Sequence, residues 1–438
     1  MTNSAFLLFW IASRKLLSQK LKLWKSLSGG LFSIFFSIVL LSTCQNSYSD
    51  PSPDPEVTPE VTKGYVDPGT LNTGLPVLKI NTTDGQAILS KENYITADIQ
   101  IIDPNNDSYC LETITEIRRR GNATWRYPKK PYRLKFFEKK SLFGLTKAKS
   151  WVLLANFQDP TLLMNTVAFE LGNRMGLPYT NHYIHVELVL NDVYEGSYVL
   201  TEQVQVGKGR VDIDEDAGFL VELDVYYDEE PKFRTQNYRL PVMIKSPEGL
   251  SDISGYNFVI NSINALDTRL YDGNFPMNGY HDLIKTDTFV DFLLINEIVG
   301  NGELGHPKST YMYKDKDGKI NMGPLWDFDW GYGYSGRGNK YFIQTDYRNE
   351  IHPFFNRLFD DPDFRTDYKT HWNANYSSIA DIPNFIDEMA QKLELSQRTN
   401  YKVWQWSDGI NYAHQIQRMK TWWNRRIVYL NNEINKPE

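Results

Sequence analysis

The order of the secondary-structure patterns along the 438-residue chain is the feature that most constrains its fold. Segments typical of β-strands run from Leu75 to about Pro247, and helical spacing of apolar residues dominates after residue 353. Strands and helices would alternate instead in a protein built on a parallel sheet. The sequence therefore predicts an α+β fold with a strand-rich N-terminal part and a helical C-terminal part.

Turn residues separate the predicted elements. Asn191-Asp192 is a hairpin signal between two strands. Asp159-Pro160 suits the start of a helix, because Asp is favoured at the N-cap and Pro in the first turn. We expect strands at residues 75–80, 86–90, 94–102, 132–137, 151–154, 185–190, 196–206, 218–227 and 240–247, and helices after residue 160 and at 353–376, 382–395 and 412–434.

The N-terminal region predicts export and a lipid anchor. Residues 1–43 carry five basic residues, no acidic residue and an apolar run that ends at Leu41-Ser42-Thr43-Cys44, which resembles a bacterial lipobox. We expect a lipoprotein-type signal peptide at 1–43, with the lipid on Cys44 holding the protein to the bacterial membrane or cell surface. Residues 44–70 are rich in Pro, Asp, Ser and Thr and are expected to be a disordered tether ahead of a domain at 71–436.

Charge and cysteine content exclude some classes of function. Beyond residue 43 the chain has 42 basic residues against 54 acidic ones, which argues against a nucleic-acid partner because such binding needs a basic face. If Cys44 carries lipid, Cys110 has no partner for an intramolecular disulfide. Cys110 is then expected to be a small buried residue.

The stretch from residue 289 to 333 carries the strongest chemical signal. It predicts an apolar helix, a loop, a hairpin turned at Asp317-Gly318, and an Asp-x-Asp motif between two tryptophans. Asp327 and Asp329 are expected to point the same way from an extended segment and to offer two oxygen ligands to one hard cation. His306, in the loop, has no His or Cys partners at ligand spacing, which argues against zinc.

Two further groups of charged residues accompany this motif. Residues 129–135 include Lys130, Arg133 and Lys135, which form either a solvated face or a surface that holds phosphate. Charged residues within apolar strands predict either ion pairs or a polar cleft, since an unpaired buried charge is costly: Glu202, Glu222, Asp224 and Lys245. The acid pair, Glu303 as a base and the basic residues of 129–135 are the parts of metal-assisted phosphoryl transfer, although no P-loop motif is present.

Four blocks together resemble the spore coat protein H (CotH) kinase family. They are RGNATWRYPKKPYRLKFF, WVLLANFQDPTLLMNT, GSYVLTEQVQV and STYMYKDKDGKINMGPLWDFDWGYG, in the order found in the family. The resemblance implies a divergent protein-kinase-like fold, secreted, that binds ATP with Mg²⁺ and phosphorylates an acceptor protein on Ser or Thr. It implies metal binding by Asp327 and Asp329, a catalytic role for Glu303, and phosphate binding by Lys130, Arg133 and Lys135, with Glu202 pairing with Lys130.

The chain departs from the family pattern at two positions. Glu303 stands where the family usually has Asp, and a catalytic base is sensitive to about an ångström of displacement. Met164 stands where such proteins often carry Arg before Asn, which removes one phosphate contact.

Two alternatives remain open. One is a non-catalytic surface protein that binds glycan or protein on a degenerate kinase-like fold, through exposed residues of a chain that is 14% aromatic. The other is a glycoside hydrolase that uses two carboxylates such as Glu303 and Asp327, roughly 5 to 10 Å apart.

Overall fold

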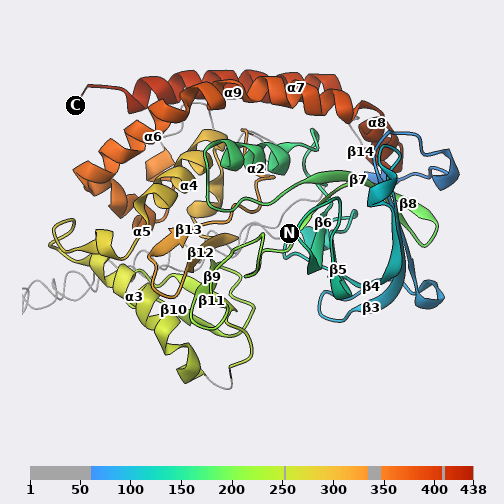
Figure 1. The fold of residues 1–438 in the computed structure, drawn as a ribbon. Coiled ribbons are helices and arrows are strands. Elements are labelled where there is room, and N and C mark those ends of the chain that lie inside the picture. Colours follow the sequence, from blue (N-terminus) through green and yellow to red (C-terminus); the bar gives the residue numbers. More distant parts are fainter. Residues whose placement is uncertain (1–60, 251–252, 334–346, 407–409, 438) are drawn as a thin grey trace, which may run out of the picture. The chain divides into compact units, whose positions relative to one another are not determined.

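The computed structural model describes residues 61–250, 253–333, 347–406 and 410–437 (Figure 1). The predicted signal peptide, Cys44 and most of the predicted tether lie outside the described residues. No helix in the described part of the chain is both long enough and apolar enough to cross a membrane.

In the described part of the chain, seven strands form a closed barrel in the order β2-β3-β4-β5-β6-β8-β7 (Figure 1). Neighbouring strands are antiparallel except β2 and β7, which are parallel. Alternate residues point inward, as Ala97, Ile99 and Ile101 do in β3, and fill an apolar interior. The strands are β2 (Val77–Thr82), β3 (Ile95–Ile102), β4 (Leu111–Arg119), β5 (Tyr132–Lys140), β6 (Ala148–Leu154), β7 (Ile184–Leu190) and β8 (Val193–Glu202).

The hairpin predicted between β7 and β8 is confirmed. Asn191 and Asp192 both adopt positive φ angles, 49° and 58°, as a two-residue turn of matching twist requires. The strand predicted at 86–90 is wrong, because this segment is a loop between β2 and β3. Cys110 is exposed, so its predicted burial is also wrong: it follows a short turn, Asp107–Tyr109, that leads into β4 at the surface.

A second, five-stranded sheet follows the barrel, in the order β10-β11-β9-β12-β13. Its strands are β9 (Phe219–Leu223), β10 (Lys232–Arg234), β11 (Pro241–Ser246), β12 (Thr310–Lys314) and β13 (Ile320–Met322). The β12–β13 pair confirms the hairpin predicted at Asp317-Gly318. Two helices connect β11 to β12: α3 (Asn257–Tyr271), which we did not predict, and α4 (Thr286–Val299), which we did.

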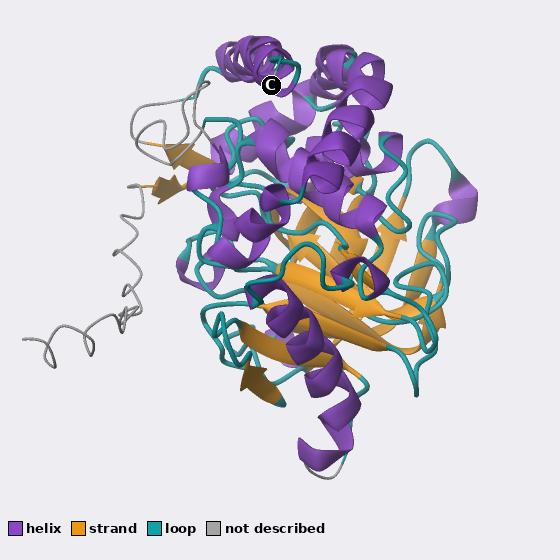
Figure 2. Cartoon of the chain, turned by 90° about the vertical axis from the view of Figure 1, so that its left-hand side faces the viewer, coloured by secondary structure: helices purple, strands orange, loops and turns teal. Residues whose placement is uncertain are grey.

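The helical C-terminal part is confirmed. It contains α5 (Pro353–Asn356), α6 (Pro362–Ala380), α7 (Ile382–Lys392), α8 (Glu394–Val403) and α9 (Tyr412–Ile434). Figure 2 shows these helices above the strands, with α3 below them. Together with α2 (Met164–Arg174) and α4, they share one apolar core with the second sheet. The α+β class and its division into a strand-rich and a helical part are as predicted.

A small pair of strands joins the two ends of the described chain. β1 (Val61–Lys63), which lies in the segment expected to be a tether, pairs antiparallel with β14 (Trp404–Trp406). α8, just before β14, packs against β8 of the barrel. The barrel is therefore held from outside by residues from the C-terminal part.

Candidate active site

The Asp-x-Asp motif lies in a loop after β13 that docks on the start of α2. The Phe328 amide donates to Asn165 Oδ1 at 2.8 Å, and the Tyr332 hydroxyl donates to the Met164 carbonyl at 2.8 Å. Asp159 orders the same helix end, because its Oδ2 accepts from the Met164 amide at 2.7 Å. The helix begins at Met164, four residues later than Pro160, where we expected it. The Met164 side chain is buried in the core, so this position offers no contact to a phosphate.

Asp327 and Asp329 lie close together, but not on an extended segment. Asp327 has a φ of 66°, in the left-handed region, and the Ser309 hydroxyl donates to its Oδ2 at 3.4 Å. Burial raises the pKa of the Asp329 carboxyl well above its usual value, and the Asp327 carboxylate raises it further. Two such groups side by side need a proton or a cation between them. This arrangement fits a hard divalent cation.

Glu303 belongs to the same cluster. It lies in a short 3₁₀ turn, Gly302–Leu304, directly after α4, and the side chain of Asn301 accepts from its amide at 3.3 Å. Its carboxylate is close enough to raise the pKa of Asp329. The structure thus brings together three acidic residues that the sequence selected, from two different loops.

The acidic cluster has two cations beside it that sequence reasoning missed. The Arg120 guanidinium lies 5.1 Å from the centre of the Trp326 ring; burial lowers its pKa, while Tyr311 and Asp327 act to raise it. Burial also acts to lower the pKa of Lys308, but Glu303 and other anionic neighbours outweigh this effect and raise it. The sequence did carry a signal for Arg120: it lies two residues after Arg118, so both side chains are expected on the same face of the strand. In the structure Arg118 lies opposite Arg133. Lys308 offered no comparable signal.

The predicted basic residues lie at different distances from this cluster. Arg133 faces outward from the barrel, donates to Ser150 Oγ at 3.3 Å and is close enough to act on the pKa of Arg120. Lys130 donates to the Trp125 carbonyl at 3.0 Å, and Lys135 is exposed beside the Tyr94 ring. Of these three residues, Arg133 is the one that the described contacts connect with the acidic cluster.

Glu202 has a different partner from the one expected. Its carboxylate interacts with His182, at 2.6 Å from Nδ1 and 2.9 Å from the backbone amide, and this hydrogen bond raises the pKa of His182. Glu202 ends β8 opposite Trp151, whereas Lys130 precedes β5 and binds Trp125. In the described structure the two residues therefore have separate partners, and the expected ion pair is not formed.

The charged residues of the second sheet form both ion pairs and part of the site. Glu222 accepts from the Tyr311 hydroxyl at 2.8 Å and pairs with Lys245 at 3.1 Å. Asp224 accepts from the Tyr226 amide at 2.8 Å and from the Ser309 amide at 3.3 Å. Burial and the neighbouring Glu222 raise the pKa of Asp224 to about 7. Asp224 is thus linked to Asp327 through Ser309.

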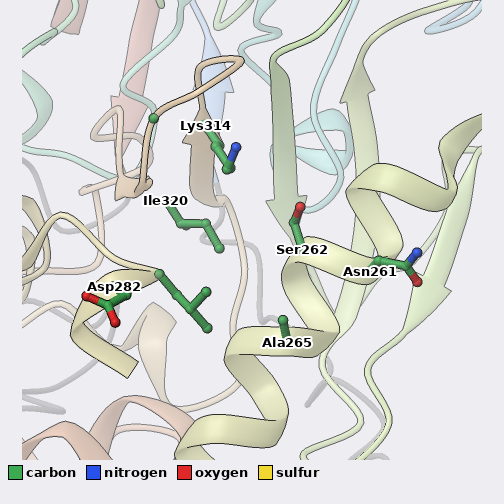
Figure 3. Close-up of a pocket in the computed structure, with 8 residues that line it drawn as sticks. Asn261, Ser262, Ala265, Asp282, Lys314 and Ile320 are labelled. Carbon is green, nitrogen blue, oxygen red and sulfur yellow. The ribbon is translucent and has the colours of Figure 1, made fainter. Parts of the chain in front are cut away.

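The described residues also contain a second acidic group and a surface hollow. His281, Asp361 and Asp363 are the described residues that bring three potential ligand atoms within 4.8 Å of one another. Asp361 already accepts from the Tyr280 hydroxyl and from the Asp363 amide at the start of α6, which is a structural role. A hollow of about 300 Å³ lies between α3 and the β12–β13 hairpin (Figure 3) and is lined by residues such as Ser262, Ala265 and Lys314. It lacks the paired carboxylates of the Asp-x-Asp cluster.

Fold and site together define an α+β protein in which a barrel and a second sheet bring acidic residues and two cations to one place. A family model described as CotH kinase protein matches residues 117–430. The chain belongs to the CotH kinase protein family. No curated protein matches it. Among solved structures, the crystal structure of the Golgi casein kinase is similar, with a TM-score of 0.30 and 9% identity over 83% of this chain and 75% of that one.

Proposed function

We propose that this protein is an atypical protein kinase, which transfers the γ-phosphoryl group of ATP to a Ser or Thr hydroxyl of an acceptor protein with the help of Mg²⁺. The observation that carries the proposal is the buried pair Asp327 and Asp329, with Glu303 on one side and the cations Arg120 and Lys308 beside it. Membership of the CotH kinase family supports it. We further propose a divergent protein-kinase-like fold.

The two carboxylates Asp327 and Asp329 suit magnesium better than a metal ion that takes all of its ligands from the protein. Glu303 does not complete a group of three ligand atoms within 4.8 Å with the two aspartates in the described structure. Mg²⁺ typically takes one or two carboxylates and completes its coordination with water and phosphate oxygens. Asp327 and Asp329 would hold the ion, which when bound would neutralise charge on the phosphates.

The reaction itself needs few protein groups, because phosphoryl transfer depends mainly on positioning and on charge neutralisation. The acceptor hydroxyl oxygen forms a bond to the γ-phosphorus, the bond from that phosphorus to the β–γ bridging oxygen breaks, and that oxygen leaves on ADP. Glu303 accepts the hydroxyl proton. Arg133, from the predicted set of Lys130, Arg133 and Lys135, would hold phosphate on the barrel side.

A binding experiment tests the proposal. We expect calorimetry on the full chain to detect ATP binding that depends on Mg²⁺, and radiolabelled ATP to detect autophosphorylation. Asp327→Ala should abolish the magnesium dependence, and Asp317→Ala, at the exposed hairpin turn, is the matched control. Absence of magnesium-dependent ATP binding to the wild-type chain would rule out the kinase function. Binding without transfer would favour the second candidate, a non-catalytic surface protein, which the Glu303 departure makes worth testing.

We also propose that the protein is exported and anchored by lipid on Cys44, with the domain facing an external acceptor protein or glycan. The lipobox-like LSTC sequence supports this location. In a bacterial host, labelled fatty acid should be incorporated into the wild-type chain and not into the Cys44→Ala variant. Labelling of both, or of neither, would contradict the anchor.

A further inference from the structure

Lys308 lies on a segment that the end of the second sheet holds firmly. The Val225 amide donates to the Pro307 carbonyl at 2.9 Å, and Asp224 accepts from the Ser309 amide at 3.3 Å. Ser309 itself has a φ of 47°, which is uncommon for a residue with a side chain. The backbone position of Lys308 is therefore set by its neighbours on both sides.

The side chain of Lys308 lies near the acidic cluster but forms no contact ion pair with its carboxylates. The ammonium group is attracted by Glu303, Asp224 and Asp327, and it lies 5.8 Å from the centre of the Tyr226 ring. Within the described residues it forms no ion pair within 4.0 Å. A half-buried ammonium near three carboxylates that contacts none of them directly is available to an anion or can be displaced by a cation.

Arg120 reaches the same carboxylate from the barrel. Its guanidinium group stacks near Trp326 and interacts with Asp327 and Glu222 electrostatically, and no described residue forms a contact ion pair with it. The Arg120 side chain is half-buried, so a guanidinium without a direct partner is open to an anionic ligand. Asp327 thus has two cations near it that come from different parts of the fold.

We propose that Lys308 and Arg120 form an anion subsite across Asp327 that holds the transferred phosphoryl group from two sides, and that Lys308 neutralises the acidic cluster when no metal is bound. The proposal rests on the proposed kinase function and adds two residues to its phosphate-binding machinery. The two side chains suit different tasks. The guanidinium of Arg120 is planar and held by Trp326, whereas Lys308 has a flexible stem that lets its ammonium move from carboxylates to phosphate.

This dual role predicts opposite effects on two ligands. Removing the charge of Lys308 takes a repelling cation away from the metal site, so Lys308→Met should bind Mn²⁺ alone about three- to tenfold more tightly. The same variant should bind pyrophosphate in the presence of Mn²⁺ about ten- to a hundredfold more weakly, because a charge-assisted hydrogen bond is lost. A purely structural lysine would weaken both ligands or affect neither.

The experiment measures both affinities by calorimetry on the full chain. The variants are Lys308→Met, Lys308→Arg and Arg120→Gln, with Lys316→Met, on the exposed hairpin, as the matched control. We expect Lys308→Arg to recover most of the pyrophosphate affinity, Arg120→Gln to weaken pyrophosphate, and the control to match the wild type. A melting temperature for each variant shows that it is folded.

The outcomes separate this subsite from the kinase function. If Lys308→Met folds and binds Mn²⁺ no more tightly than the wild type, or binds pyrophosphate equally well, the subsite is refuted while the kinase function stands. If the wild-type chain binds neither Mn²⁺ nor pyrophosphate, both ideas fail. Tighter Mn²⁺ binding with weaker pyrophosphate binding, restored by Lys308→Arg, supports the subsite.

Discussion

Two regions of the molecule bury charge in opposite ways. At the junction of β8 and α8, the ammonium of Lys129 is almost fully buried and donates to the Ser197 carbonyl and to Asn400 Oδ1, the second at 2.9 Å. Asn400 also accepts from the Ser197 amide at 3.1 Å. In the acidic cluster, by contrast, Asp327 and Asp329 face each other while Arg120 and Lys308 lie nearby without direct ion-pair partners among the described residues.

This contrast separates buried charges that serve folding from those that serve chemistry. A buried ammonium that donates to two buried acceptors, as Lys129 does, contributes to packing, and removing it leaves those acceptors unsatisfied. A group of charges that repel one another, or that lack contact partners, is destabilising until a ligand completes it. Substitutions in the two regions should therefore affect different measurements.

The largest expected effect is at the acid pair. Asp327→Ala should lower phosphoryl transfer by about 10³-fold or more, since a bound metal contributes several kcal/mol of charge stabilisation. Its melting temperature should change little, because relief of the repulsion with Asp329 opposes the strain of an alanine at a φ of 66°. Radiolabel transfer and calorimetry check these expectations. A large loss of stability would show that Asp327 serves folding, as Lys129 does.

Glu303→Gln comes next. It should lower the rate of transfer by about 10²-fold, within the range typical of general bases, while the affinity for ATP stays unchanged. Steady-state kinetics separates the two, and the conservative variant Glu303→Asp shows whether the longer side chain is the suitable one here. Equal rates for Glu303→Gln and the wild type would remove Glu303 from the reaction.

The β8–α8 junction should respond in stability alone. Gly196 has a φ of 103°, and a Cβ there would lie 2.4 Å from Asn400 Oδ1. Gly196→Ala should lower the free energy of unfolding by about 2 to 4 kcal/mol through backbone strain and overpacking. Gly74→Ala is the control, because its φ is 78° but a Cβ would have no atom within 4 Å. Urea denaturation measures both, and equal losses would show that crowding at Asn400 contributes nothing.

The same junction should also show a pH dependence. Burial lowers the pKa of Lys129 from 10.5 to about 7, so between these values the unfolded chain binds more protons than the folded one. The contribution of Lys129 to stability therefore rises with pH from about 7 to about 10. Unfolding free energies at several pH values should show a shallower rise for Lys129→Met than for the wild type. An unchanged slope would mean that Lys129 stays charged when buried.

Local sequence patterns predicted most helices, strands and turns, but they could not predict which distant strands pair with each other. The helix expected at 412–434 is α9 with the same limits, and the Asn191-Asp192 turn joins β7 to β8. The barrel was not foreseen, because its closure depends on a parallel register between β2 and β7, more than 100 residues apart. No local periodicity encodes such a partner.

The same limit applies to the site. Asp327 and Asp329 were identified from the Asp-x-Asp motif between two tryptophans, and Glu303 from its loop after an apolar helix and from the family resemblance. Arg120 and Lys308 were missed because their importance comes only from the fold, which brings both of them near Asp327. The expected pair between Glu202 and Lys130 was wrong, because the fold brings His182 into contact with Glu202. No sequence pattern indicates that contact.

The contact between β8 and α8 can form only late in the synthesis of the chain. A ribosome completes the barrel strands at Glu202, but Asn400, which accepts from Lys129, is still about 200 residues away. At about 5 to 20 residues per second, the wait is roughly 10 to 40 s. During this interval the outer face of β8 has no α8 to cover it, and Lys129 lacks one of its acceptors. The nascent barrel therefore exposes a surface that the finished fold covers.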